Sequence, residues 1–72
     1  MSHPISDAVY DFIRSYQKRH RIPPTFREIA DGCHVGTTTV HYHLKRLQAS
    51  RRIRYTKRRA RSIILLDEVQ DE

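Results

Sequence analysis

The chain has 72 residues, enough for one small domain with a modest core and too few for an elaborate active site. Its formal net charge of +6 favours a polyanionic partner such as a nucleic acid. The single cysteine, Cys33, excludes an internal disulfide, and no apolar run approaches the roughly 20 residues of a membrane span. No secretory or lipidation signal is visible, so we expect a cytoplasmic protein without a membrane partner.

The positive charge is concentrated in one half of the chain. No acidic residue occurs from 32 to 66, and nine of the 14 Lys and Arg residues lie between 45 and 61. Cations at this density repel one another, which favours a partner that neutralises them. The alternative is a solvated basic surface, or a flexible basic arm, with no partner of its own.

The N-terminal segment is predicted to form a first helix. Ser6 is its expected N-cap, and Ile5 is expected to pack onto Tyr10 as a hydrophobic staple. The apolar stripe of this helix comprises Val9, Phe12, Ile13 and Tyr16. The run Ile22 to Pro24 ends the helix and forces an extended entry into the next one.

Residues 25–50 have the pattern of a helix-turn-helix. Thr25 and Glu28 form the expected capping box of a helix that runs to about Cys33. Gly36 interrupts the pattern, and a third helix is predicted from Thr37 or Thr38 to Ser50. Its apolar residues recur at i, i+4 and i+7, and they are Val40, Leu44 and Leu47. In this motif the later helix lies in the major groove of DNA.

After Arg52 the pattern changes from helical to alternating. Ile53 and Tyr55 are predicted to share one face of a strand, and residues 57–61 form a polar turn. Residues 62–66 make a second strand; a C-terminal helix is the alternative, which the β-branched Ile63 and Ile64 disfavour. The expected fold is therefore an α+β winged helix-turn-helix over residues 5–66, with three helices followed by a two-stranded β-hairpin wing. Residues 67–72 form an acidic tail that we expect to be flexible.

The core is predicted from these periodic patterns. Its expected members are Val9, Phe12, Ile13, Tyr16, Ile22, Phe26, Ile29, Ala30, Val35, Val40, Leu44, Leu47, Ile53, Tyr55, Ile63 and Leu65.

An inward stripe on the third helix fixes which side chains face outward. The expected base-reading residues are Thr38, Thr39, His41 and Tyr42. The expected contacts to the DNA backbone are Arg27, Thr37, Lys45 and Arg46. The wing adds Lys57, Arg58, Arg59 and Arg61, which can clamp phosphates or enter the minor groove. Helix capping by Thr37 and packing of Tyr42 on the next turn are the alternatives.

We expect no metal, cofactor, small-molecule ligand or enzymatic activity. His41 and His43 are two residues apart on a helix, which turns their side chains about 200° from each other. A structural zinc site also needs ligand spacings that one cysteine cannot provide. His43, on the flank of the apolar stripe, is expected to be hydrogen-bonded and partly buried. No catalytic constellation is visible.

Several motifs together resemble the N-terminal DNA-binding domain of LexA repressors. They are Ile5-Ser6, residues 12–14 (Phe-Ile-Arg), 22–25 (Ile-Pro-Pro-Thr), 27–30 (Arg-Glu-Ile-Ala), 39–47 (Thr-Val-His-Tyr-His-Leu-Lys-Arg-Leu) and the two wing strands. The resemblance implies a winged helix-turn-helix that covers promoter operators, with Thr38, Thr39, His41 and Tyr42 at the base-reading positions. Operators of this family are two-fold symmetric, which implies a possible homodimer on a palindromic site.

The chain departs from this family at four points. The turn before the third helix is one residue shorter, and Arg51 replaces an expected glycine, at a cost of about 1 kcal/mol if it is left-handed. The wing turn lacks glycine and is more basic. The self-cleaving peptidase domain of the family is absent, which indicates an excised domain or a stand-alone relative.

These observations predict a sequence-specific regulator of transcription that binds double-stranded DNA and acts as a repressor at the nucleoid. Two alternatives stay open. One is a winged-helix module that binds an acidic protein partner, and the other is a non-specific DNA- or RNA-binding protein.

Overall fold

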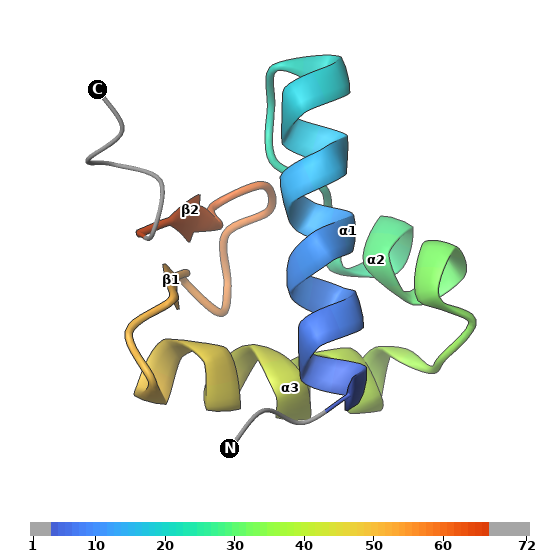
Figure 1. Cartoon of the computed structure of the whole chain (residues 1–72), viewed down its shortest axis with the longest axis vertical. Helices are drawn as coiled ribbons and strands as arrows, with labels where there is room; N and C mark the ends of the chain where they lie inside the picture. Colours follow the sequence, from blue (N-terminus) through green and yellow to red (C-terminus); the bar gives the residue numbers. More distant parts are fainter. Residues whose placement is uncertain (1–3, 67–72) are drawn as a thin grey trace.

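The computed structural model describes residues 4–66. Within this range the chain forms, in order, α1 (Pro4–His20), α2 (Phe26–Cys33), α3 (Thr37–Ala49), β1 (Ile53–Arg54) and β2 (Ile64–Leu65). Three helices followed by an antiparallel hairpin make a winged helix-turn-helix, so the predicted fold class is confirmed (Figure 1). The predicted acidic tail, residues 67–72, lies outside the described residues.

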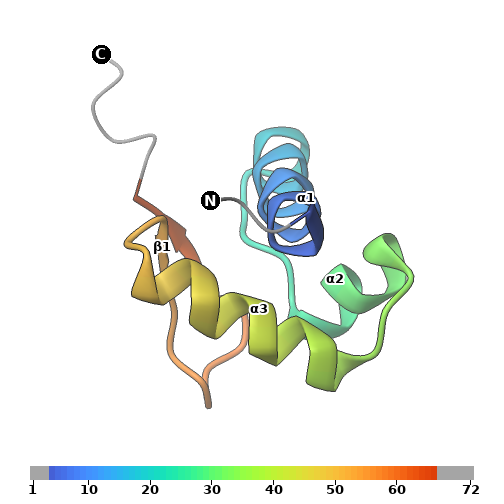
Figure 2. The ribbon, with the colours of Figure 1, turned by 60° about the horizontal axis from the view of Figure 1, so that its bottom comes forward.

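The helices pack as a small three-helix core with the hairpin at one end. α1 lies across both α2 and α3, and α3 extends toward β1 (Figure 1). In Figure 2 the loop between the strands projects past α3 on the side away from α1. The outer side of α3 and the loop are therefore not covered by α1.

The start of α1 differs from the prediction. The helix begins at Pro4, where the fixed φ of proline suits a first helical turn, so Ser6 lies inside the helix and does not cap it. Ser6 is instead buried, and its hydroxyl lies 2.7 Å from Nδ1 of His43. The expected staple is also wrong, because Ile5 is itself helical and 40% exposed.

Each of the three helices is followed, within two residues of its end, by a residue other than glycine with left-handed backbone geometry. These residues are Arg21, His34 and Arg51, with φ of 67°, 59° and 63°. After α3, the N–H of Arg51 donates to Gln48 and that of Arg52 donates to Leu47, which is a Schellman motif. The left-handed geometry anticipated for Arg51 is therefore present, together with its steric strain.

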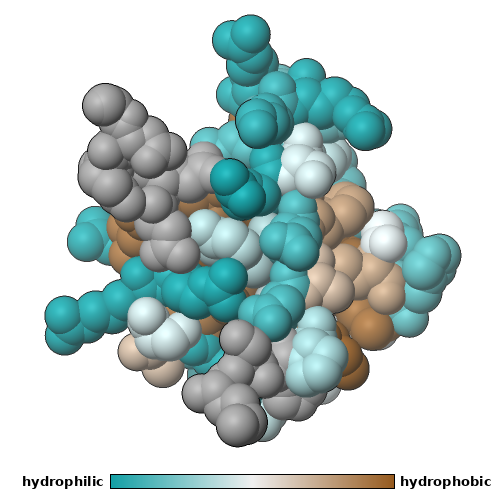
Figure 3. All heavy atoms as spheres, viewed as in Figure 1, coloured by the Kyte–Doolittle hydropathy of each residue, from teal (hydrophilic) through white to brown (hydrophobic). Residues whose placement is uncertain are grey.

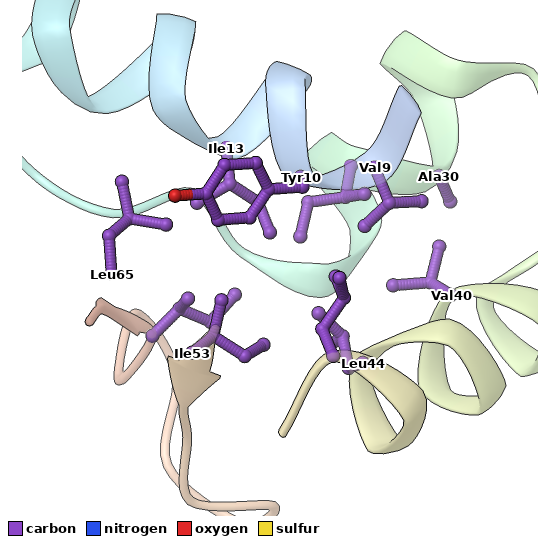
Figure 4. Close-up of a cluster of buried hydrophobic side chains, with 11 residues drawn as sticks. Val9, Tyr10, Ile13, Ala30, Val40, Leu44, Ile53 and Leu65 are labelled. Carbon is purple, nitrogen blue, oxygen red and sulfur yellow. The ribbon is translucent and has the colours of Figure 1, made fainter. Parts of the chain in front are cut away.

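The core gathers apolar side chains from every element (Figure 4). Its fully covered members include Val9, Ile13, Ile29, Val40, Leu44, Ile53 and Ile63. Phe12, Phe26, Val35 and Tyr55 pack against it but stay partly exposed. Burial of these side chains is the main force that holds the domain together.

Three core assignments were wrong, those of Tyr16, Ile22 and Tyr10. Tyr16 is only partly buried and lies outside the core cluster, with its ring 4.2 Å from that of His20. Ile22 is 44% exposed although Pro24, two residues later, is fully buried, so the linker after α1 turns inward only beyond Ile22. Tyr10 was not predicted but is only 5% exposed, since the Arg52 guanidinium lies over its ring at 4.1 Å from the centroid. A long-range contact of this kind has no local sequence signal.

The strands are shorter than expected, with two residues each. Ile53 pairs with Leu65, and Arg54 pairs with Ile64. The predicted alternation is confirmed, since Ile53, Ile63 and Leu65 are buried while Ile64 is 51% exposed. Residues 55–63 form a long loop rather than a continued ladder, and Tyr55 lies just beyond β1.

Hydrophilic side chains cover most of the face shown in Figure 3, and apolar ones gather where α1 lies against α2. At this contact a Cβ added to Gly32 would come within 2.0 Å of the Phe12 ring, so the absent side chain of Gly32 admits Phe12.

Within residues 4–66, no helix combines the length and apolar character needed to cross a lipid bilayer.

Candidate nucleic-acid interface

The turn between α2 and α3 sets the position of the candidate recognition helix. His34 is left-handed, and the next N–H, of Val35, donates to Ala30, which closes α2 with a second Schellman motif. Gly36 then serves as the N-cap of α3 without a side-chain hydrogen bond. Thr37 is therefore the first helical residue, and the alternative that its hydroxyl caps the helix is wrong.

The two sides of α3 differ in burial as predicted. Val40, Leu44 and Leu47 are at most 2% exposed, and they anchor the helix against the core. The candidate DNA-contacting residues Thr37, Thr38, Tyr42, Lys45 and Arg46 are exposed, and Thr39 and His41 are partly exposed. The amphipathic pattern therefore correctly separates the inner and outer sides of this helix.

Aromatic contacts restrain two of the outer side chains. The ring of His41 meets Phe26 edge-on at 4.5 Å, and Phe26 in turn meets Tyr55 at 5.8 Å. His41 is thereby tied to the start of α2 and to the wing. Tyr42 contacts His43 and lies 5.8 Å from the Arg46 guanidinium, yet it remains 54% exposed. Its phenol is thus partly packed and still accessible.

His43 lies on the inner side of α3. The predicted hydrogen bond is present, but its partner, Ser6, was not predicted, and at 3% exposed His43 is fully rather than partly buried. His41 and His43 thus face different surroundings. Among residues 4–66, no group of three or more His, Cys, Asp or Glu side chains is arranged to hold a metal ion.

The wing loop and the start of α2 together form a basic hollow. Arg27 lines a cavity of about 300 Å³ with the exposed loop residues Lys57, Arg58 and Arg59. Thr25, Phe26 and Ala60 complete its wall. None of the lining residues is acidic, so the four cations give this part of the surface a positive charge. The sequence identified these four cations separately, but gave no signal that Arg27 lies beside the wing.

Arg61 differs from the other wing cations because its guanidinium already has partners within the protein. Nη1 and Nη2 donate to the two carboxylate oxygens of Glu28, each at 3.1 Å. Nη1 also donates to the carbonyl of Pro23 at 2.9 Å and lies 3.4 Å from the hydroxyl of Tyr16. The sequence did not predict this ion pair, which joins residues 33 positions apart.

Glu28 has two roles at this point. The predicted capping box is confirmed, with the N–H of Thr25 donating to Glu28 at 2.8 Å and that of Glu28 donating to Thr25 at 3.1 Å. The Thr25 N–H, followed by the Arg61 guanidinium, lowers the pKa of Glu28 to about 2. The carboxylate is therefore ionised at neutral pH and can hold the wing cation.

A tight turn joining two helices, an exposed polar helix face and a basic β-hairpin beside it define a winged helix-turn-helix domain. A sequence model of the LexA DNA binding domain matches residues 6–62. The chain belongs to the LexA DNA-binding domain family.

Curated relatives agree with this assignment. The LexA repressor of Clostridium tetani is 37% identical over 62 residues, which are 85% of this chain and 31% of that protein. The LexA repressor of Magnetococcus marinus is 32% identical over 69 residues, 96% of this chain and 30% of that protein. The LexA repressor of Koribacter versatilis is 37% identical over 59 residues, which are 81% of this chain and 28% of that protein. The chain thus spans less than a third of the length of these relatives.

Proposed function

We propose that this chain is a sequence-specific repressor of transcription that reads double-stranded DNA with the outer side of α3. The observation that carries the proposal is the burial of Val40, Leu44 and Leu47, which leaves the opposite side of α3 to the solvent. The name of the relatives, LexA repressor, supports the regulatory role.

Base reading is assigned to Thr38, Thr39, His41 and Tyr42. Hydroxyl groups and ring nitrogens can exchange hydrogen bonds with base edges, and threonine methyls can contact the methyl of thymine. In helix-turn-helix proteins the N-terminal part of the recognition helix enters the major groove, and these four residues lie in the first half of α3.

Contacts to the DNA backbone are assigned to Thr37, Lys45 and Arg46 on α3 and to the basic hollow formed by Arg27, Lys57, Arg58 and Arg59. Phosphate contacts fix the position of the protein on the duplex but carry no sequence information. Two copies on a palindromic operator would place two such helices in successive major grooves.

Selection of duplexes from a random pool tests sequence-specific reading. One enriched motif supports the proposal, whereas a pool that stays random argues for a non-specific binder. With about five to eight phosphate contacts, log K should fall with a slope of roughly −4 to −7 against log salt. A flat salt dependence overturns the assigned phosphate contacts. Indifference to DNA at moderate salt overturns the whole proposal and favours an acidic protein partner. Equal competition by RNA favours the non-specific alternative.

A further inference from the structure

The Arg61 guanidinium joins three separate parts of the chain. Its hydrogen-bond partners are Tyr16 on α1, Pro23 in the linker and Glu28 on α2. Exposed ion pairs generally contribute little to the stability of a fold, because holding two long side chains in one geometry costs conformational entropy. This pair is bidentate, and the helix cap already fixes the carboxylate, so its geometry is better defined than that of an ordinary surface pair.

Arg61 also stands where the wing loop returns to β2. The N–H of Thr56 donates to the hydroxyl of Ser62 at 2.9 Å, and that hydroxyl donates back to the Thr56 carbonyl at 3.0 Å. This pair of bonds closes the loop that carries residues 57–60. The backbone of Arg61 is left-handed, with φ of 55°, a strained geometry for a residue with a side chain. Anchoring Arg61 on Glu28 therefore anchors the whole loop.

We propose that Arg61 and Glu28 are positioning residues for DNA binding. Their ion pair holds the wing loop against the start of α2, so that Lys57, Arg58 and Arg59 share one hollow with Arg27. This inference rests on the proposed DNA-binding function and assigns Arg61 a role other than direct phosphate contact. Both of its terminal nitrogens already donate to Glu28, so a phosphate at Arg61 has to compete with a carboxylate.

The substitution Glu28→Gln tests the proposal by the sign of its effect. It removes a negative charge, which by general electrostatics strengthens binding to DNA. Its amide oxygen can still accept from the Thr25 N–H, so the helix cap is retained. We expect binding of a fluorescent duplex of fixed sequence to weaken by about tenfold, and the salt slope to fall by roughly 1–2, although no cation was removed.

Asp31→Asn is the matched control. It makes the same charge change on the same helix, at an exposed residue outside the hollow. We expect this variant to bind as tightly as the parent protein or slightly more tightly. Circular dichroism melts of each variant verify that the protein is folded at the assay temperature.

Arg61→Met gives a second, independent test. Loss of one direct phosphate contact lowers the salt slope by about 0.9, whereas release of the loop lowers it by about 2–3. The double variant Glu28→Gln, Arg61→Met should bind no worse than Arg61→Met alone. In the free protein, the ¹⁵N heteronuclear NOE of residues 57–60 should drop in both single variants and stay unchanged in Asp31→Asn.

The outcomes separate the two hypotheses. If the parent protein does not bind the duplex, the proposed function fails. If it binds, and Glu28→Gln binds as tightly as Asp31→Asn with an unchanged loop NOE, the positioning role is overturned. A slope loss of only about 0.9 in Arg61→Met, with no effect of Glu28→Gln, instead shows a direct phosphate contact.

Discussion

Ser6 of α1 and His43 of α3 meet inside the domain, with the serine hydroxyl 2.7 Å from Nδ1 of the imidazole. Both residues are at most 5% exposed, so this polar contact is shielded from water. The bond links the first turn of α1 to the inner side of the candidate recognition helix. It also explains why Ser6 does not cap α1, because its hydroxyl is directed to the interior.

Ser6→Ala should destabilise the domain by about 1–2 kcal/mol, because a buried hydrogen bond is lost while His43 stays in the core. For a domain of this size, that loss lowers Tm by roughly 4–16 °C. Thermal unfolding followed by circular dichroism measures the change. Ser15→Ala, at an exposed position of the same helix, is the control and should melt close to the parent protein. Equal melting of the two variants contradicts a structural role for the Ser6 bond.

Arg51→Gly should stabilise the domain by about 1 kcal/mol, because glycine adopts the left-handed geometry observed there without steric strain. Arg51→Ala removes the same charge but keeps the Cβ, so it should give no such gain. Urea unfolding of the two variants separates relief of strain from loss of charge. If Arg51→Ala gains as much stability as Arg51→Gly, the cause of the gain is relief of charge repulsion among neighbouring cations and not relief of backbone strain.

The stability contributed by Glu28 should depend on pH. Its pKa is lowered from 4.5 to about 2 on folding, so its contribution is fully present above pH 4.5 and is lost as pH falls toward 2. We therefore expect the parent protein to melt above Glu28→Gln at neutral pH, with the gap closing between pH 4.5 and 2. Melting curves over this range provide the measurement. A gap that does not change with pH would mean that the folded and unfolded pKa values are the same.

The two groups of candidate DNA contacts should give different mutant phenotypes. His41→Ala and Tyr42→Ala should change which duplexes are preferred, because these side chains lie on the outer side of α3. Arg58→Ala and Arg59→Ala should weaken all duplexes alike and lower the salt slope by about 0.9 each. Competition among several duplexes at two salt concentrations distinguishes the groups. If all four variants lose affinity uniformly, the division between base and backbone contacts is wrong.

Much of the fold was predictable because its signals are local. The Thr25 and Glu28 capping box, the break at Gly36 and the stripe of Val40, Leu44 and Leu47 are each contained within a few residues. These signals were sufficient to predict α2, α3 and the outer side of α3, and the alternation after Arg52 was sufficient to predict the hairpin. The start of α1 was predicted three residues too late, at Asp7 after a Ser6 cap, because Ser6 suits an N-cap while Pro4 also suits a first helical turn.

The contacts that organise the candidate site come from residues far apart in the chain. The pairing of Arg61 with Glu28, the cover of Tyr10 by Arg52 and the hollow shared by Arg27 and the wing have no local pattern. Guanidinium groups can pair with many acceptors, so a count of cations cannot say which of them are engaged inside the protein. Periodicity and capping therefore specify helices and faces, whereas packing of the helices against the wing decides which cations remain available for DNA.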